Sequence, residues 1–208
     1  MIPGASSKIG EMLRYPVNFS ARAAVMIWLT AGALCLVKAR GDEPLRFQTA
    51  DEEMVDPFRD GKGKATVLVF VRTDCPISNR YATELQRIHA KFGPETVWWL
   101  IYPDRDITTK AIREHQKDYK LEIPALRDPR HLLVKLAGAQ VTPEAAVFLP
   151  GKRLVYRGRI DDRFVSFGNY RSEATRHDLE EALADVVNDK PVRISETKPI
   201  GCTISSEP

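Results

Sequence analysis

Two long apolar runs, separated by an amphipathic stretch, constrain the fold of this chain more than any other feature. Residues 65–71 read ATVLVFV and residues 97–102 read VWWLIY. Continuous apolar runs rich in β-branched and aromatic residues are typical of strands buried on both faces. Between them, apolar residues recur at helical spacing from about residue 77 to 92. The order strand, helix, strand predicts a parallel pair joined by a crossover helix.

The sequence that follows adds further helices and an antiparallel hairpin. The expected elements are a helix at 107–119, a short strand at 125–126, a short helix at 130–137, a hairpin of 145–149 with 154–156, and a last helix at 173–187. Pro150 and Gly151 supply the hairpin turn. The predicted fold is therefore α/β, with a mixed β-sheet sandwiched by helices.

A short apolar run near the N-terminus predicts a leader segment. Residues 23–37 read AAVMIWLTAGALCLV and would span about 22 Å as a helix, less than the roughly 30 Å core of a bilayer. Basic residues precede the run, and Ala39 offers a cleavage point. We expect residues 1–39 to be a signal peptide or a short membrane anchor. The body would then lie outside the cytoplasm, in the periplasm or secreted, where disulfides persist.

The remainder divides into three expected parts, with no net charge overall. Residues 40–63 are expected to form a linker with a possible edge strand, residues 64–190 the folded domain, and residues 191–208 a C-terminal tail. The chain has 31 basic and 28 acidic residues, and residues 1–39 hold four of the basic and one of the acidic residues. The rest is therefore electrically balanced, which gives no basis for a nucleic-acid partner. Membrane contact is expected only through residues 23–37.

Cys75 stands where the first buried strand gives way to the helix, in the segment TDCPIS. Free N–H groups and the helix dipole stabilise a thiolate at such a position, and the thiolate is the reactive form. Pro76 suits the first helical turn, where its missing N–H costs nothing. From position alone, a buried structural cysteine is an equally reasonable interpretation.

A second motif, Val141-Thr142-Pro143, distinguishes these interpretations. With the segments VLVFVRTDCPISNRYATELQRI, VTPEAAVF and LVYRGRIDD, it resembles the thioredoxin-like superfamily, and within it the redoxin branch related to alkyl hydroperoxide reductase and thiol-specific antioxidant proteins. The resemblance covers roughly residues 45–190. It implies that Pro143 is cis and packs against Cys75, and that Thr142 and Pro76 contact the substrate.

The sequence departs from three patterns within this superfamily. Ser78 replaces the second cysteine of Cys-x-x-Cys, so it can hydrogen-bond the Cys75 thiolate but cannot form a disulfide. The peroxiredoxin pattern P-x-x-x-T-x-x-C is absent, because Thr73 lies two residues before Cys75. Copper chaperones of this fold use Cys-x-x-x-Cys with a distant histidine, and residue 79 here is Asn. We therefore expect neither a metal nor another cofactor.

Cys202 is the one other cysteine that would remain after cleavage at Ala39. It follows the expected end of the last helix, near Asn188, by a segment that reaches about 46 Å when extended. That reach permits a Cys75–Cys202 pair without requiring one. Gly201-Cys202-Thr-Ile could dock as a short strand, and the alternative is a free thiol in the tail.

These residues suggest a redox function, with alternatives. We expect an extracytoplasmic thiol–disulfide oxidoreductase with Cys75 as the nucleophile, Ser78 and Pro143 beside it, and Cys202 as a possible resolving thiol. Its partners would be protein thiols or disulfides, or small oxidised thiols, together with an unidentified redox partner. The alternatives are a non-catalytic binding or metal-delivery module and a peroxiredoxin-like peroxidase.

Other polar residues are expected to have structural roles. The four histidines, His89, His115, His131 and His177, fall in or at the start of expected helices and should lie on helix surfaces. Asp161 and Asp162 follow the last strand and are expected to form a loop salt bridge with Arg159 or Arg163.

Overall fold

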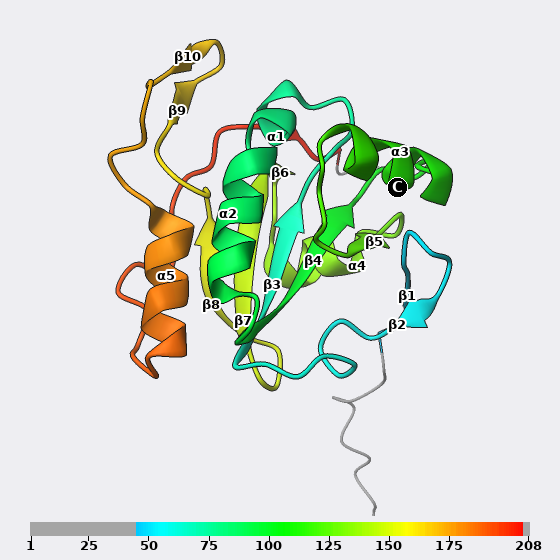
Figure 1. The fold of residues 1–208 in the computed structure, drawn as a ribbon, viewed down its shortest axis with the longest axis horizontal. Coiled ribbons are helices and arrows are strands. Elements are labelled where there is room, and N and C mark those ends of the chain that lie inside the picture. Colours follow the sequence, from blue (N-terminus) through cyan, green and yellow to red (C-terminus); the bar gives the residue numbers. More distant parts are fainter. Residues whose placement is uncertain (1–44, 206–208) are drawn as a thin grey trace, which may run out of the picture. The chain divides into compact units, whose positions relative to one another are not determined.

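The computed structural model of the chain describes residues 45–205 (Figure 1). The expected leader, residues 1–39, and the first residues of the expected linker lie outside this range. Within it, no helix is both long enough and apolar enough to cross a membrane.

A five-stranded mixed sheet forms the centre of the fold, in the order β5-β4-β3-β7-β8. The strands are β3 (Ala65–Phe70), β4 (Thr96–Tyr102), β5 (Ala125–Arg127), β7 (Glu144–Leu149) and β8 (Arg153–Gly158). Strand β4 runs parallel to both β3 and β5, whereas β7 runs antiparallel to β3 and β8. These parallel and antiparallel pairings confirm the mixed sheet predicted from the sequence. Every residue of β3 is buried, as expected for a central strand.

Helices cover both faces of this sheet (Figure 1). They are α1 (Pro76–Arg80), α2 (Ala82–Phe92), α3 (Thr109–Asp118), α4 (Leu132–Ala137) and α5 (Asp178–Val187). One face packs Val67 and Val69 with apolar residues of α2 and α5. The opposite face packs Leu68 and Phe70 with apolar residues of α4. Adjacent residues of β3 therefore contribute to two separate cores, which explains its continuous apolar sequence.

The helix expected from about residue 77 to 92 is divided at Tyr81. The amide of Tyr81 lies 3.3 Å from the Ile77 carbonyl and 3.1 Å from that of Ser78, a tightened last turn of α1. Its hydroxyl donates to the carboxylate of Asp161, which lies 80 residues later in the chain. This long-range bond fixes the residue between α1 and α2, and local helical spacing carries no sign of it.

The last helix begins at Asp178, later than the expected residue 173. The carboxylate of Asp162 accepts hydrogen bonds from the amides of Thr175 and Arg176 and from the Thr175 hydroxyl. These donors are thereby held in a loop, and α5 starts after them.

Three two-stranded pairings surround the main sheet. They are β1 (Phe47–Gln48) with β2 (Met54–Val55), β9 (Phe164–Ser166) with β10 (Asn169–Tyr170), and β6 (Val141–Thr142) with β11 (Cys202–Thr203), all antiparallel. The β1–β2 hairpin lies in the expected linker, and a single bridge from Thr49 to Leu126 joins it to β5.

The described part of the C-terminal tail follows the sheet back to the Cys75 end. Arg157 of β8 donates its amide to the Ser195 carbonyl over 2.9 Å and accepts from the Thr197 amide over 3.1 Å. The tail then reaches β6, where Cys202 pairs with Thr142. It is therefore paired at two sites of the fold.

Candidate functional site

Cys75 is held at the start of α1, directly beyond the end of β3. It is the N-cap residue of α1, and its carbonyl accepts from the Asn79 amide over 3.1 Å. The residue has 0% exposure. Its Sγ donates to the Thr142 carbonyl over 3.1 Å. A residue of the turn after β3 and the residue before Pro143 thus meet, although 67 positions separate them in the chain.

The Thr142–Pro143 peptide bond is cis. Thr142 belongs to β6, and Glu144 directly after Pro143 begins β7. Both Thr142 and Pro143 are buried. This turn presents the Thr142 carbonyl to the Cys75 sulfur.

Cys202 lies against Cys75 as part of strand β11. Its Sγ donates to the Cys75 Sγ over 2.8 Å, and both residues are free thiols. Three groups therefore form a hydrogen-bonded row, from the Cys202 thiol to the Cys75 thiol to the Thr142 carbonyl.

The residues around Cys202 fix its position. A Cβ added at Gly201 would lie 2.2 Å from the Thr142 carbonyl oxygen, so only glycine permits this approach. On the other side, the Ile204 amide donates to the Gln140 carbonyl over 2.9 Å, and the Ile204 side chain is buried in the core that also contains Leu133. A glycine contact and an apolar anchor therefore hold Cys202 from both sides.

The surroundings of Cys75 favour its thiolate. Burial raises the pKa of this thiol, but hydrogen bonds from the Cys202 thiol and from the hydroxyl and amide of Ser78 outweigh it, so the pKa lies below its ordinary value. The buried Ser78 hydroxyl has no hydrogen-bond partner among residues 45–205. A thiolate at Cys75 would give this hydroxyl an acceptor.

The same geometry has the opposite effect on Cys202. Burial raises its pKa first, and donation to Cys75 and the charge of the Cys75 thiolate raise it further, to about 11. Arg72 opposes this shift and Asp74 adds to it. The two thiols therefore differ in ionisation, and the thiolate is favoured at Cys75 over Cys202.

The comparisons with known proteins agree with this geometry. The model of the AhpC/TSA family matches residues 45–159, more than half of the chain. The chain belongs to the AhpC/TSA family. No curated protein sequence matches it.

Solved structures with similar folds share little sequence with this AhpC/TSA-family chain. An uncharacterised conserved protein from Geobacillus kaustophilus has a TM-score of 0.67 at 23% identity, over 81% of this chain and 92% of that one. A hypothetical protein from Sinorhizobium meliloti has a TM-score of 0.68 at 23% identity, over 79% and 93%. A thioredoxin-like protein from Aeropyrum pernix has a TM-score of 0.50 at 14% identity, over 70% and 89%. The fold is thioredoxin-like.

The residues predicted for the site do not all lie equally close to Cys75. Thr142 and Cys202 hydrogen-bond its sulfur directly, and Ser78 lies close enough to lower the pKa of its thiol. Pro143 adjoins Thr142 through the cis bond. Pro76 follows Cys75 on α1 with its side chain exposed.

The expectation that His115 lies on a helix surface is wrong. His115 is only 6% exposed and lies between Tyr102 of β4 and Asn79 of α1. His131 is the N-cap residue of α4, at a helix start as expected, whereas His177 is the N-cap residue of α5 rather than a position inside the last helix. The spacing of α3 offered one signal, since His115 shares its buried face with Ile112.

The acidic pair after β8 also has partners other than those expected. Asp161 accepts from the Tyr81 hydroxyl and from the Arg163 amide, rather than forming a side-chain salt bridge with Arg159 or Arg163. Asp162 forms its salt bridge with Arg171, at 3.3 Å. Both carboxylates therefore organise the loop that leads to α5.

Within residues 45–205, one group of three possible metal ligands lies close together. It consists of Glu84, His177 and Glu180. Glu180 already pairs with Arg87 and Lys91, and these cations oppose the binding of a metal ion. The cluster is adequately explained as surface ion pairing between α2 and α5.

Proposed function

We propose that this AhpC/TSA-family protein is an extracytoplasmic thiol–disulfide oxidoreductase, with Cys75 as its nucleophile and Cys202 as its resolving thiol. The observation that carries the proposal is the 2.8 Å approach of the two sulfurs, made by a tail strand that pairs with Thr142. The location rests on the sequence of residues 1–39, which resembles a leader.

The proposed reaction is two successive thiol–disulfide exchanges. The Cys75 thiolate attacks one sulfur of a substrate disulfide, forming a Cys75–substrate disulfide and expelling the other substrate sulfur as a thiolate. Cys202, after losing its proton to solvent, attacks the Cys75 sulfur and expels the second substrate thiolate. The substrate gains two electrons, the protein holds a Cys75–Cys202 disulfide, and an external dithiol reductant restores the two thiols.

The electrostatics of the pair suit this sequence of steps. While Cys75 is a thiolate, its charge and its hydrogen bond help keep Cys202 protonated. Once Cys75 is part of a mixed disulfide, that negative charge is gone, and the pKa of Cys202 falls. The resolving thiol therefore becomes more reactive when it is needed.

The tail also controls access to Cys75. Because Cys75 is fully buried beside β11, a protein disulfide requires displacement of β11 before it can reach the sulfur. A small oxidised thiol needs less displacement. The expected substrates are thus small disulfides. Protein disulfides are also expected to react, at a rate that depends on how often β11 is displaced.

A peroxidase activity is the second candidate, because the family includes alkyl hydroperoxide reductases by name. Against it, the sequence before Cys75 lacks the P-x-x-x-T-x-x-C pattern. We therefore treat hydrogen peroxide as a comparison substrate in the test.

The test follows oxidation of the reduced full-length protein by glutathione disulfide and, separately, by hydrogen peroxide. Peptide mapping by mass spectrometry should find a Cys75–Cys202 disulfide. Cys202→Ser should instead accumulate Cys75 joined to glutathione, and Cys75→Ser should form neither product. Cys35→Ser is the matched control and should behave as the unmodified protein.

Two results would contradict the proposal. A Cys202→Ser protein that releases glutathione from Cys75 as fast as the unmodified protein would show that Cys202 is not the resolving thiol. If hydrogen peroxide oxidises Cys75 faster than glutathione disulfide does, the result would favour a peroxidase activity.

A further inference from the structure

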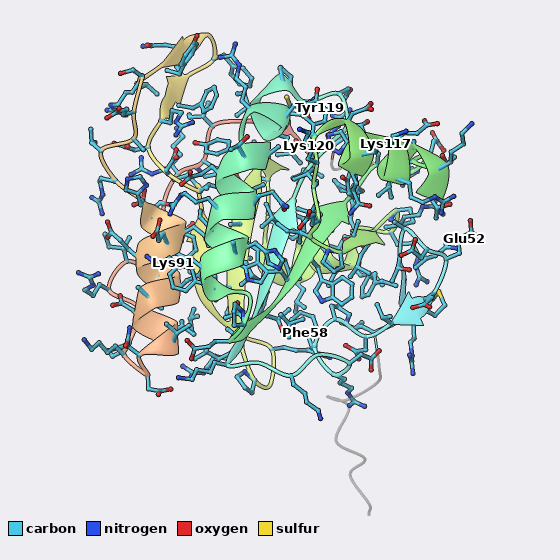
Figure 2. All side chains as sticks on the ribbon, viewed as in Figure 1. Glu52, Phe58, Lys91, Lys117, Tyr119 and Lys120 are labelled. Carbon is cyan, nitrogen blue, oxygen red and sulfur yellow. The ribbon has the colours of Figure 1, made fainter. Side chains whose placement is uncertain are left out.

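A row of hydrogen bonds joins the buried core to the loop that carries Cys75. The Tyr102 hydroxyl lies 2.8 Å from His115 Nδ1, and His115 Nε2 lies 2.9 Å from Asn79 Oδ1. Asn79 Nδ2 then donates to the Thr73 carbonyl over 3.1 Å and to the Tyr119 hydroxyl over 2.9 Å. Figure 2 shows Tyr119 at the end of α3 nearest α1. The row links β4, α3, α1 and the turn before Cys75.

With the His115 ring neutral, only one arrangement of protons satisfies every member of this row. Tyr102 is fully buried, and burial raises the pKa of its hydroxyl, so it remains a donor and donates to His115 Nδ1. His115 Nε2 then carries the proton of a neutral ring and donates to Asn79 Oδ1. Burial lowers the pKa of His115, with Asp118 opposing, which agrees with the neutral form. The Asn79 amide is thereby oriented with both N–H groups toward Thr73 and Tyr119.

Asn79 secures the Cys75 loop at two points. Its side chain binds the carbonyl of Thr73, two residues before the cysteine, and its backbone amide binds the carbonyl of Cys75 itself. The side-chain contact depends on amide orientation, because a rotated amide would place its oxygen against the Thr73 carbonyl oxygen. His115 fixes that orientation by donating to the amide oxygen.

We propose that His115 is a positioning residue for Cys75, which it holds against Thr142 and Cys202 by orienting the Asn79 side chain. The proposal deepens the proposed function, since it concerns the reactivity of the same nucleophile. It predicts that loss of the His115 N–H changes the chemistry of Cys75 in a protein that remains folded.

A matched pair of variants separates positioning from core filling. His115→Leu retains apolar volume but removes the donor, whereas His115→Gln keeps an N–H group at the reach of Nε2. The readout is the rate of iodoacetamide alkylation of Cys75 against pH, resolved by mass spectrometry of its peptide, in full-length reduced protein below its melting temperature. The pH of half-maximal rate is compared rather than the rate itself, because tail opening alters the rate at every pH.

The expected result is a rise of this midpoint in His115→Leu by about 0.5–1 pH unit, which is about threefold to tenfold less thiolate at neutral pH. His115→Gln should stay near the unmodified midpoint. Asn79→Ala should match His115→Leu, and the double variant should add nothing further, because both changes remove one interaction.

A purely structural role for His115 predicts a different outcome. His115→Leu would then lower the melting temperature but leave the alkylation midpoint of Cys75 unchanged, and this would overturn the proposal. If His115→Leu fails to fold, an unchanged midpoint in Asn79→Ala would overturn it equally. Alkylation needs no Cys75–Cys202 disulfide, so failure of the proposed function would be seen separately, as absence of that disulfide in the unmodified protein.

Discussion

The regions around the two cysteines are built in contrasting ways. Cys75 is the fully buried N-cap of a helix and follows a central strand whose residues are all buried. Cys202 belongs to a two-residue strand, is partly exposed, and lies in a segment whose main anchors are Gly201 and Ile204. Short peripheral strands open at a lower free-energy cost than central ones.

This contrast suits the different tasks that the proposed function gives to the two thiols. A nucleophile benefits from a fixed environment, because hydrogen bonds that stabilise its thiolate must be in place before reaction. A resolving thiol must leave while the substrate occupies its place and then return. The proposed nucleophile lies in the core of the fold, and the proposed resolving thiol lies on a two-residue peripheral strand.

The largest expected effect on the two thiols comes from a change that prevents β11 from docking on β6. Gly201→Val places a side chain against the Thr142 carbonyl, because the added Cβ alone would lie 2.2 Å from that oxygen. We expect formation of the Cys75–Cys202 disulfide to slow by about fivefold to 150-fold, which corresponds to the ~1–3 kcal/mol cost of overpacking. The measurement is the disulfide yield over time with glutathione disulfide as oxidant.

The control for this change lies two residues further along the chain, in β11. Thr203→Val alters an exposed side chain of β11 and should leave the rate close to that of the unmodified protein. Equal rates for Gly201→Val and the unmodified protein would show that docking of β11 is not required.

The chemical inequality of the two thiols can be sharpened by their pH dependence. The pKa of Cys75 is lowered, so its thiolate persists as the pH falls, whereas that of Cys202 is raised to about 11, so its thiolate appears only in strong base. At pH 8, alkylation should label Cys75 about tenfold faster than Cys202, after allowing for the lower nucleophilicity of the more acidic thiol.

Exposure alone predicts the reverse order, since Cys202 is the more accessible of the two. Faster labelling of Cys202 at pH 8 would therefore mean that access, rather than ionisation, governs the reactivity of this pair.

The smallest expected effect concerns Ser78. Removing its hydroxyl in Ser78→Ala takes away one of the donors that lower the pKa of Cys75, while the Cys202 thiol and the Ser78 amide remain. The alkylation midpoint of Cys75 should rise by about 0.5 pH unit, which is about threefold less thiolate. A fall or no change in the midpoint would show that the hydroxyl does not interact with the thiolate.

Much of the fold could be predicted because its central features are local. Residues 65–71 and 97–102 are almost entirely apolar, since each strand faces two cores, and their spacing leaves room for one crossover helix. The division of the helix at Tyr81 and the late start of α5 could not be predicted. Both depend on Asp161 and Asp162, which lie about eighty and thirteen residues from their respective partners Tyr81 and Thr175.

The site was predictable in its residue types more than in its arrangement. Cys75 and Thr142 carry local motifs, whereas the position of Cys202 depends on contacts of Gly201 and Ile204 with distant backbone. The partners of His115 could not be predicted because they lie on β4 and α1, and the spacing of residues within α3 gives no information about those contacts.

The path of the tail along β8 has a consequence for solubility. Ser195 and Thr197 bond to both backbone groups of Arg157, on the outermost strand of the main sheet. Unpaired sheet edges recruit strands from other molecules. A chain cut before Ser195 would therefore lose more than the Cys202 thiol. The edge of β8 would be exposed and could pair with strands of other molecules, which leads to aggregation.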